Sequence, residues 1–215
     1  MERIDIEHCR QRNREDHLAR YEFATSFVSG KRVLDLACGT GYGTKMLRDA
    51  GADVLGVDIS DDVIEENREE YGDYFEQCDI TTFSSDPFDV IVCFETIEHI
   101  KDYKTAIANL RKLLKHDGML IISSPNRRLT EPLFGKKCVS FHEKEFIPSE
   151  LSEAIGVHGF MCIKQYGQRL QPKLPFKFLR IIYRLLMKPH HNASAKVQLI
   201  MPHYEGRYFL LTAIL

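Results

Sequence analysis

The chain has 215 residues, 44% of them hydrophobic, and a formal net charge of −2. That length allows one domain with a full core, over residues 1–215, and the near-neutral charge gives no overall surface for binding nucleic acid. The 6 cysteines show no Cys-x-x-Cys spacing, the charged first residues do not resemble a signal peptide, and no apolar run approaches membrane-spanning length. We therefore expect a cytoplasmic protein.

An amphipathic helix is predicted over residues 14–29, before any strand signal. Leu18, Tyr21, Phe27 and Val28 fall at positions that can pack against a core.

A glycine-rich turn follows the first predicted strand. Residues 31–36 form a short β-rich run, glycines at 39, 41 and 43 follow, and residues 44–50 have helical character. Glycines in such a strand-to-helix turn let the backbone approach a ligand closely. The next predicted strand ends at Asp58, which is placed to accept hydrogen bonds from both hydroxyls of a ribose. Together these features predict a nucleoside-binding site.

The pattern of the turn argues against a dinucleotide. Dinucleotide-binding turns need a glycine at the sixth position, which here is Thr44. Asp35, four residues before Gly39, would repel a pyrophosphate but attract the sulfonium and ammonium groups of S-adenosylmethionine. S-adenosylmethionine is therefore the predicted cofactor.

Helix and strand signals alternate from Lys31 to Ile163. This alternation predicts an α/β fold with a doubly wound, seven-stranded, mostly parallel sheet, in which the last strand, residues 207–214, is antiparallel. Two segments lie outside the pattern: a cap segment, residues 124–147, and a helical insert, residues 169–205.

The turn and the elements after it resemble the class I, Rossmann-like S-adenosylmethionine-dependent methyltransferases. Residues 35–41 match the family's Asp/Glu-x-Gly-x-Gly-x-Gly signature, with Ala37 where the first glycine is usual. The resemblance covers residues 17–163. The chain also carries Ser-Pro-Asn at 124–126 and Phe-His-x-x-Glu-Phe at 141–146. In these two elements it is similar to ubiquinone-pathway O-methyltransferases and polysaccharide-cluster methyltransferases.

The resemblance implies the residues of the cofactor site. Asp58 would bind the ribose, Asp79 the adenine amino group, and Arg20 with Tyr21 would cover the methionine end, as an alternative to a core role. The full implied set is Arg20, Tyr21, Asp35, Ala37, Gly39, Gly41, Asp58, Ile59, Asp79, Ile80, Phe94 and Glu95.

Methyl transfer from a sulfonium needs alignment and, for a hydroxyl acceptor, a base. His99, just past the fourth predicted strand, is the preferred catalytic residue, and His142 in the cap segment is the second. Either histidine could instead serve a structural hydrogen bond. We expect O-methylation of a small-molecule, sugar or glycan-type acceptor without a metal ion, and the sequence does not specify which acceptor.

The insert contains a predicted basic amphipathic helix, residues 176–188. One face of this helix carries the cationic residues Lys177, Arg180, Arg184 and Lys188. The rest of the helix is a broad apolar face. Three interpretations stay open: packing on the sheet or on a second copy in a homodimer, a lid over the acceptor, or contact with a membrane surface.

Two other functions keep the same fold. Glu95, Glu98, His99 and His142 are similar to the Glu-x-x-Glu-His…His metal set of small-RNA 3′-end 2′-O-methyltransferases, although that family's denser histidine cluster is missing. The domain could also be a non-catalytic S-adenosylmethionine-binding subunit. For the preferred function, O-methylation of a small-molecule, sugar or glycan-type acceptor, nucleic acid is not an expected partner. We expect the chain to be a monomer or a homodimer.

Overall fold

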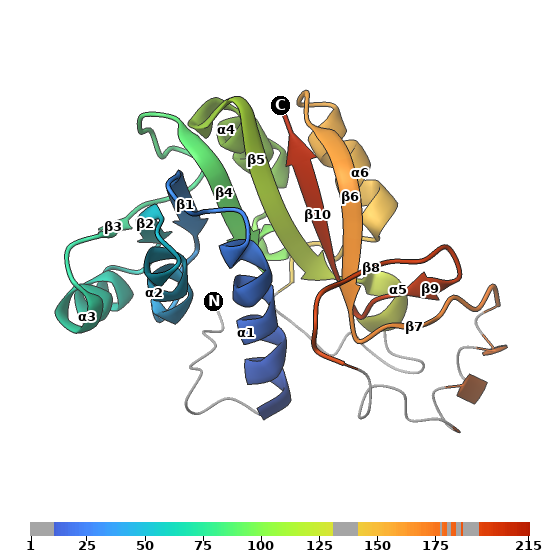
Figure 1. Ribbon diagram of the computed structural model, residues 1–215. Helices are drawn as coiled ribbons and strands as arrows, with labels where there is room; N and C mark the ends of the chain where they lie inside the picture. Colours follow the sequence, from blue (N-terminus) through green and yellow to red (C-terminus); the bar gives the residue numbers. More distant parts are fainter. Residues whose placement is uncertain (1–10, 131–141, 177, 180–181, 184–185, 187–193) are drawn as a thin grey trace.

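The computed structural model describes residues 11–130, 142–176, 178–179, 182–183, 186 and 194–215 (Figure 1). The strands of its main sheet are β1 (Arg32–Leu36), β2 (Asp53–Asp58), β3 (Phe75–Gln77), β4 (Phe88–Phe94), β5 (Leu114–Pro125), β6 (Met161–Gln168), β8 (Gln198–Leu199) and β10 (Tyr208–Ile214). Their order is β3-β2-β1-β4-β5-β10-β6-β8. The first five strands are parallel, and β10 runs antiparallel to β5 and β6.

The predicted α/β fold is confirmed, but the strand count was wrong. The described part of the main sheet has eight strands and not seven, because the two-residue β8 pairs with the outer edge of β6. So short a strand leaves no periodic signal in the sequence. A separate pair, β7 (Gln171–Pro172) with β9 (Tyr204–Glu205), also lies within the predicted insert.

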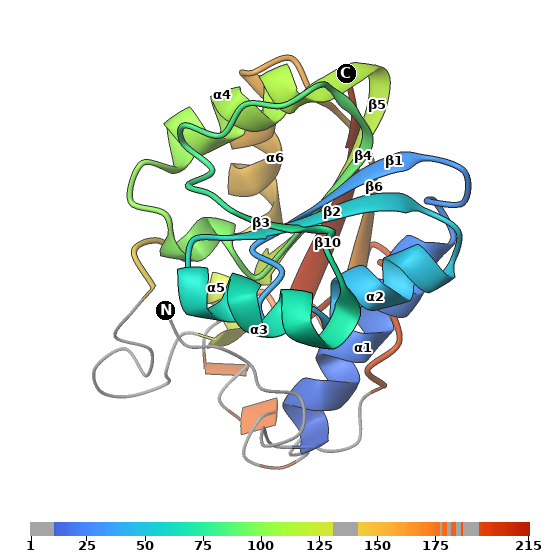
Figure 2. The ribbon, with the colours of Figure 1, turned by 90° about the vertical axis from the view of Figure 1, so that its left-hand side faces the viewer.

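Helices cover both faces of the sheet (Figure 2). The helices are α1 (Gln11–Thr25), α2 (Tyr42–Asp49), α3 (Asp61–Tyr71), α4 (Tyr103–Leu113), α5 (Arg127–Thr130) and α6 (Pro148–Gly156). The pair α1 and α2 lies on the face opposite α4 and α6. α1 begins at Gln11, before the predicted start at residue 14, and ends at Thr25, before the predicted end at residue 29.

The alternation of side chains along β4 divides the core into two layers. Val90 and Val92 pack with Tyr21 of α1, whereas Ile91 and Cys93 pack with the layer that contains α4 and α6. All of these β4 residues are buried, as expected for a central parallel strand covered on both faces. Within the described residues, no helix combines the length and apolar character needed to cross a membrane.

Most of the predicted helix 176–188 and much of the cap segment lie outside the described residues. Within the predicted helix 176–188, the described residues 178–179, 182–183 and 186 are helical. Phe178, Ile182 and Leu186, spaced four residues apart, are exposed, so their shared face is not packed on the sheet.

Candidate functional site

The predicted site residues meet beyond the carboxyl ends of β1, β2 and β4, which point toward the lower part of Figure 1. Open α/β sheets bind ligands at this edge because the loops that leave the strands gather there. The loop after β1 carries the glycines, the loop after β2 follows Asp58, and the loop after β4 carries Glu95 and His99.

The glycine loop has a left-handed backbone at three positions. Ala37, Gly39 and Gly41 have φ values of 56°, 53° and 72°. A Cβ added to Gly39 would meet no described atom within 4 Å, so open space lies beside this backbone. Ala37 adopts a conformation that costs a residue with a Cβ about 1 kcal/mol, which explains why glycine is usual at this place in the signature.

Asn67 of α3 holds the loop from the side. Its Nδ2 donates to the carbonyl oxygen of Gly39 at 2.7 Å. A Cβ at Gly41 would lie 2.8 Å from Asn67 Oδ1, so glycine is required there by space as well as by φ. These contacts help to fix the shape of the loop.

Asp58 is fixed by two backbone amides. Its Oδ2 accepts from the N–H of Gly39 and its Oδ1 from the N–H of Ser60, both at 3.1 Å. A carboxylate oxygen can accept two hydrogen bonds, so each oxygen retains capacity for one ribose hydroxyl. Asp58 thus joins the glycine loop to the end of β2.

The residues predicted to contact adenine lie next to Asp58. The Ile59 side chain is exposed and follows Asp58 directly, while Ile80 is buried. Asp79 Oδ1 accepts from the N–H and the Oγ1 of Thr81, both at 2.8 Å, and these bonds lower the pKa of Asp79. The backbone bond from Cys78 to Asp58 brings the two strand ends together.

Asp35 is fully buried beneath the glycine loop. Thr44 Oγ1 donates to its Oδ2 at 2.7 Å, and Tyr21 Oη donates to its Oδ1 at 3.1 Å. Burial nevertheless raises the pKa of Asp35 to about 7, and the nearby Asp58 charge adds to the effect. A cation bound beside Asp35 would favour its ionised form.

Tyr21 of α1 packs closely against the glycine turn. The packing role that the sequence predicted for Tyr21 is therefore confirmed. A Cβ added to Gly43 would lie only 2.0 Å from the Tyr21 ring, so glycine is required for α1 to dock. The ring also packs edge-on against Phe94, at a centroid distance of 5.2 Å. Tyr21 thus lies in the core, and its hydroxyl reaches Asp35. The alternative role that the sequence analysis gave it, covering the methionine end of the cofactor, stays a prediction.

Arg20, which directly precedes Tyr21 in α1, is completely buried. Its Nη1 donates to Gln168 Oε1 at 2.7 Å, and its guanidinium lies 5.0 Å from the centre of the Tyr208 ring. Nε and Nη2 have no hydrogen-bond partner among the described residues. A buried guanidinium with two unused donors is suited to a carboxylate, which accepts two parallel hydrogen bonds.

The end of β4 brings two acids near this guanidinium. Glu95 has φ 50°, and its Oε1 accepts from Ser123 Oγ at 2.8 Å. Burial raises the pKa of Glu95, and Arg20 partly opposes this. Burial and the Glu95 charge raise the pKa of Glu98 well above its ordinary range.

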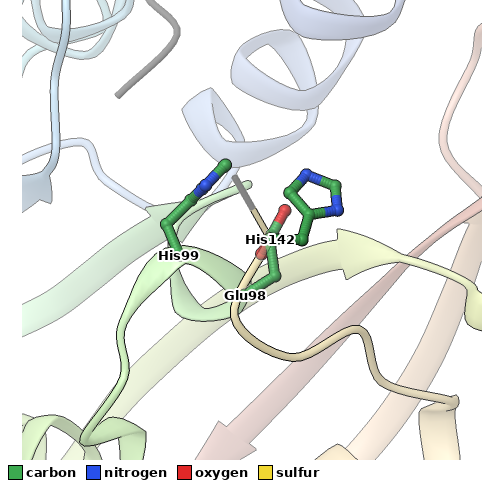
Figure 3. A group of neighbouring side chains, drawn as sticks. All are labelled: Glu98, His99 and His142. Atoms are coloured by element: carbon green, nitrogen blue, oxygen red, sulfur yellow. The ribbon is translucent and has the colours of Figure 1, made fainter. Parts of the chain in front are cut away.

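Glu98, His99 and His142 form a cluster (Figure 3). Glu98 and His99 come from the 3-10 turn η1 (Ile97–His99), and His142 comes from the cap segment. One ligand-type atom of each residue lies within 4.8 Å of the others, and the two imidazole rings meet edge to face with centroids 4.8 Å apart. The structure therefore brings together both histidines that the sequence nominated as bases.

Several residues of the site escaped the sequence analysis. They hold the named residues through side-chain bonds: Thr44, Asn67, Ser123, Ser124, Thr130, Glu145 and Gln168. The fixed spacing of His142 and Glu145 within Phe-His-x-x-Glu-Phe was the one signal that could have indicated a contact. The other partners are set by the fold.

Comparisons with known proteins agree with this geometry. A family model described as a methyltransferase domain matches residues 7–165. The chain belongs to this methyltransferase family. A ubiquinone biosynthesis O-methyltransferase of Actinobacillus pleuropneumoniae serotype 7 is 39% identical over 167 residues, covering 66% of this chain and 71% of that protein. Against others of that name, this methyltransferase spans 48% of their length.

Solved methyltransferases share the fold. One from Thermotoga maritima has a TM-score of 0.69 and 17% identity, covering 95% of this chain and 91% of that chain. Magnesium protoporphyrin IX methyltransferase of Synechocystis, crystallised with S-adenosylmethionine, has a TM-score of 0.57 and 19% identity, covering 95% and 79%. The predicted family, enzyme class and S-adenosylmethionine cofactor are confirmed.

Proposed function

We propose that this methyltransferase transfers a methyl group to a hydroxyl oxygen of a small-molecule, sugar or glycan-type acceptor. The observation that carries the proposal is the pairing of His99 and His142 beyond the carboxyl end of β4. A hydroxyl needs a base when it attacks the sulfonium methyl group, and imidazole is the side chain suited to that task near neutral pH. The names of the O-methyltransferase relatives support the choice of oxygen.

The cofactor would lie across the glycine loop. We assign its ribose hydroxyls to Asp58, its adenine to the space between Ile59 and Asp79, its cationic centre to the side of Asp35, and its carboxylate to Arg20. The buried, unused Nε and Nη2 of Arg20 support the last assignment, because among the described residues nothing else satisfies them.

The test is methyl transfer from S-adenosylmethionine labelled in the methyl group. Three probes cover the candidate classes: 3,4-dihydroxybenzoate, a methyl hexopyranoside and a short RNA with a free 3′ end. We expect an O-methyl product from one of the first two, abolished by His142→Ala but unaffected by His116→Ala, whose side chain is 88% exposed. A product methylated on nitrogen would contradict the proposal.

A metal-dependent RNA methyltransferase is the second candidate, favoured by the Glu98, His99 and His142 cluster. Among the described residues, buried Glu98 Oε1 has no hydrogen-bond partner, as expected of a metal ligand before binding. However, two ligands at about 2.1 Å from one ion cannot lie more than about 4.2 Å apart, so a separation of up to 4.8 Å requires the side chains to move.

Chelation separates the two candidates. We expect EDTA to leave methyl transfer unchanged and purified protein to contain no stoichiometric metal. Loss of RNA methylation on chelation, restored by manganese or magnesium, would favour the second candidate instead. Binding of S-adenosylmethionine with no transfer to any probe would favour a non-catalytic subunit.

We also propose that the insert contacts the acceptor or a membrane surface. The exposed row of Phe178, Ile182 and Leu186 supports this assignment, together with the cationic residues that the sequence places between them. Basic amphipathic helices combine apolar insertion with attraction to anionic headgroups.

A further inference from the structure

His142, one of the two proposed bases, has a carboxylate partner. His142 Nδ1 and Glu145 Oε1 lie 2.8 Å apart, and the two side chains are only 10% and 9% exposed. The other carboxylate oxygen, Oε2, accepts a hydrogen bond from Thr130 Oγ1 at 2.6 Å. The three side chains thus form a chain from hydroxyl to carboxylate to imidazole.

The order of donors in this chain determines the state of the imidazole. An ionised carboxylate only accepts hydrogen bonds, so the His142 Nδ1 must carry the proton that is shared with Glu145. A neutral imidazole protonated at Nδ1 presents Nε2 as its acceptor nitrogen. Nε2 can then take the proton of an acceptor hydroxyl while the oxygen forms its bond to the methyl group. The sulfur keeps the electron pair of the broken S–CH₃ bond and leaves as a neutral thioether.

The backbone around Glu145 is held tightly against the end of β5. The Glu145 carbonyl oxygen accepts from Arg127 Nη1 at 3.1 Å, and the Arg127 N–H donates to the carbonyl oxygen of Phe146 at 2.9 Å. Phe146 is fully buried in the core and forms a parallel bridge with Asn126. Glu145 is therefore placed by packed structure, as a group that orients a base must be.

The same segment is tied to the second part of the cluster. The N–H of Lys144 donates to the Glu98 carbonyl oxygen at 3.1 Å, which joins the cap segment to η1. The position of His142 relative to His99 is thus fixed at two points, Lys144 and Glu145.

We propose that Glu145 is a positioning residue that holds His142 with Nδ1 protonated and Nε2 as the proton acceptor, and that Thr130 fixes the Glu145 carboxylate. This inference deepens the proposed function and rests on it, because it assigns a task to the neighbour of a proposed base.

Nitrogen-15 NMR of ring-labelled histidine tests the tautomer without an acceptor. The chain has 9 histidines, and the His142 signals are identified by their loss in His142→Ala. We expect wild-type protein to show a protonated Nδ1 and an unprotonated Nε2. In Glu145→Leu, which removes the acceptor oxygens, we expect the Nδ1–H form to become the minor one.

Matched variants separate positioning from loss of fold. Glu143→Leu removes an exposed acid two residues before Glu145 and should leave the His142 signals unchanged. Thr130→Val should shift the tautomer populations in part, and Thr130→Ser, which retains the hydroxyl, should restore them. If Glu145→Leu does not fold, the Thr130 pair decides the question. Unchanged His142 signals in folded Glu145→Leu, or in Thr130→Val if Glu145→Leu does not fold, overturn the inference.

Kinetics with the acceptor found above gives the second readout. We expect Glu145→Leu to lower kcat on the order of 100-fold, with the KM for S-adenosylmethionine changed less than about twofold. Full activity of His142→Ala would overturn the assignment of His142 as the base. If His142→Ala loses activity as expected but Glu145→Leu keeps full activity, only the positioning role of Glu145 is overturned.

Discussion

The two proposed sides of the site, the cofactor side around the glycine loop and the acceptor side around His99 and His142, are held together by different kinds of contact. On the cofactor side, backbone amides of Gly39 and Ser60 hold Asp58, and left-handed φ angles shape the loop. On the proposed acceptor side, side chains also hold side chains from distant parts of the chain, as in the bond from Lys144 Nζ to Tyr103 Oη, 41 residues apart. The cofactor side is therefore defined by a short segment, whereas the acceptor side exists only once distant segments have packed.

This difference predicts how each side responds to substitution. Changes in the cofactor loop should act through shape and be severe even when no hydrogen-bonding group is lost. Changes on the acceptor side should alter transfer or partner binding while cofactor affinity stays the same. The following predictions test that division, from the largest effect on the cofactor side to the smallest.

Gly43→Ala should have the largest effect. The new Cβ would lie 2.0 Å from the Tyr21 ring, so α1 must shift and the bond from Tyr21 to Asp35 is lost. We expect the free energy of unfolding to fall by about 3 kcal/mol, measured by denaturant titration. Gly156→Ala is the control, because a Cβ there meets nothing within 4 Å. Equal stability of the two variants would show that α1 does not depend on the loop.

Asp58→Ala should weaken S-adenosylmethionine binding by about 2–3 kcal/mol in calorimetry, since a charged acceptor shared by two hydroxyls is lost. Asp53→Ala, at the exposed start of the same strand, should bind normally. An unchanged affinity for Asp58→Ala would remove the ribose assignment.

The pH dependence of binding should reveal Asp35. Its pKa is raised from 3.8 to about 7 by burial, so the folded, ligand-free protein holds a proton that the unfolded chain releases. The stability of the ligand-free protein should therefore fall as pH rises from about 4 to about 7. A cationic cofactor needs the ionised form, so affinity should rise roughly tenfold between pH 6 and pH 8. Asp35→Asn should show weak binding without this pH dependence, and a parallel profile for both proteins would argue against a cation beside Asp35.

Removing the cations of the insert should have the smallest effect on the cofactor side. We expect the triple variant Lys177→Gln, Arg180→Gln and Arg184→Gln to bind S-adenosylmethionine normally but to lose sedimentation with phosphatidylglycerol vesicles or affinity for the acceptor. The matched control changes Lys101, Lys104 and Lys112, which border or lie on α4, to Gln. If both triple variants behave like wild type, the insert has only a structural role.

Much of the cofactor side was readable from the sequence because its chemistry is local. The glycine turn, Asp35 and Asp58 lie close together in the sequence, and the structure places both acids against the glycine loop. The steric role of Gly43 was not readable, because it depends on a ring from α1 that reaches the loop through tertiary packing. The alternation of elements was sufficient to predict the parallel half of the sheet.

The acceptor side was readable only as a list of candidates. As candidate bases, His99 and His142 were chosen separately. The resemblance to a metal-ligand set grouped them, but nothing in the sequence showed that their rings touch. Thr130 and Glu145 lie 15 residues apart, and their bond depends on the path of the chain around Asn126. The short β8 was missed because two residues have no periodicity.

The position of β10 has a consequence for synthesis on the ribosome. β10 follows β6 in the chain but lies between β5 and β6 in the sheet. Until β10 has emerged, the open edge of β5 has no neighbour, and β6 has only the two-residue β8 to pair with. A nascent chain arrested before Tyr208 should thus hold a protease-resistant cofactor half attached to an unprotected β6, and such exposed strand edges are the segments that bind chaperones or aggregate.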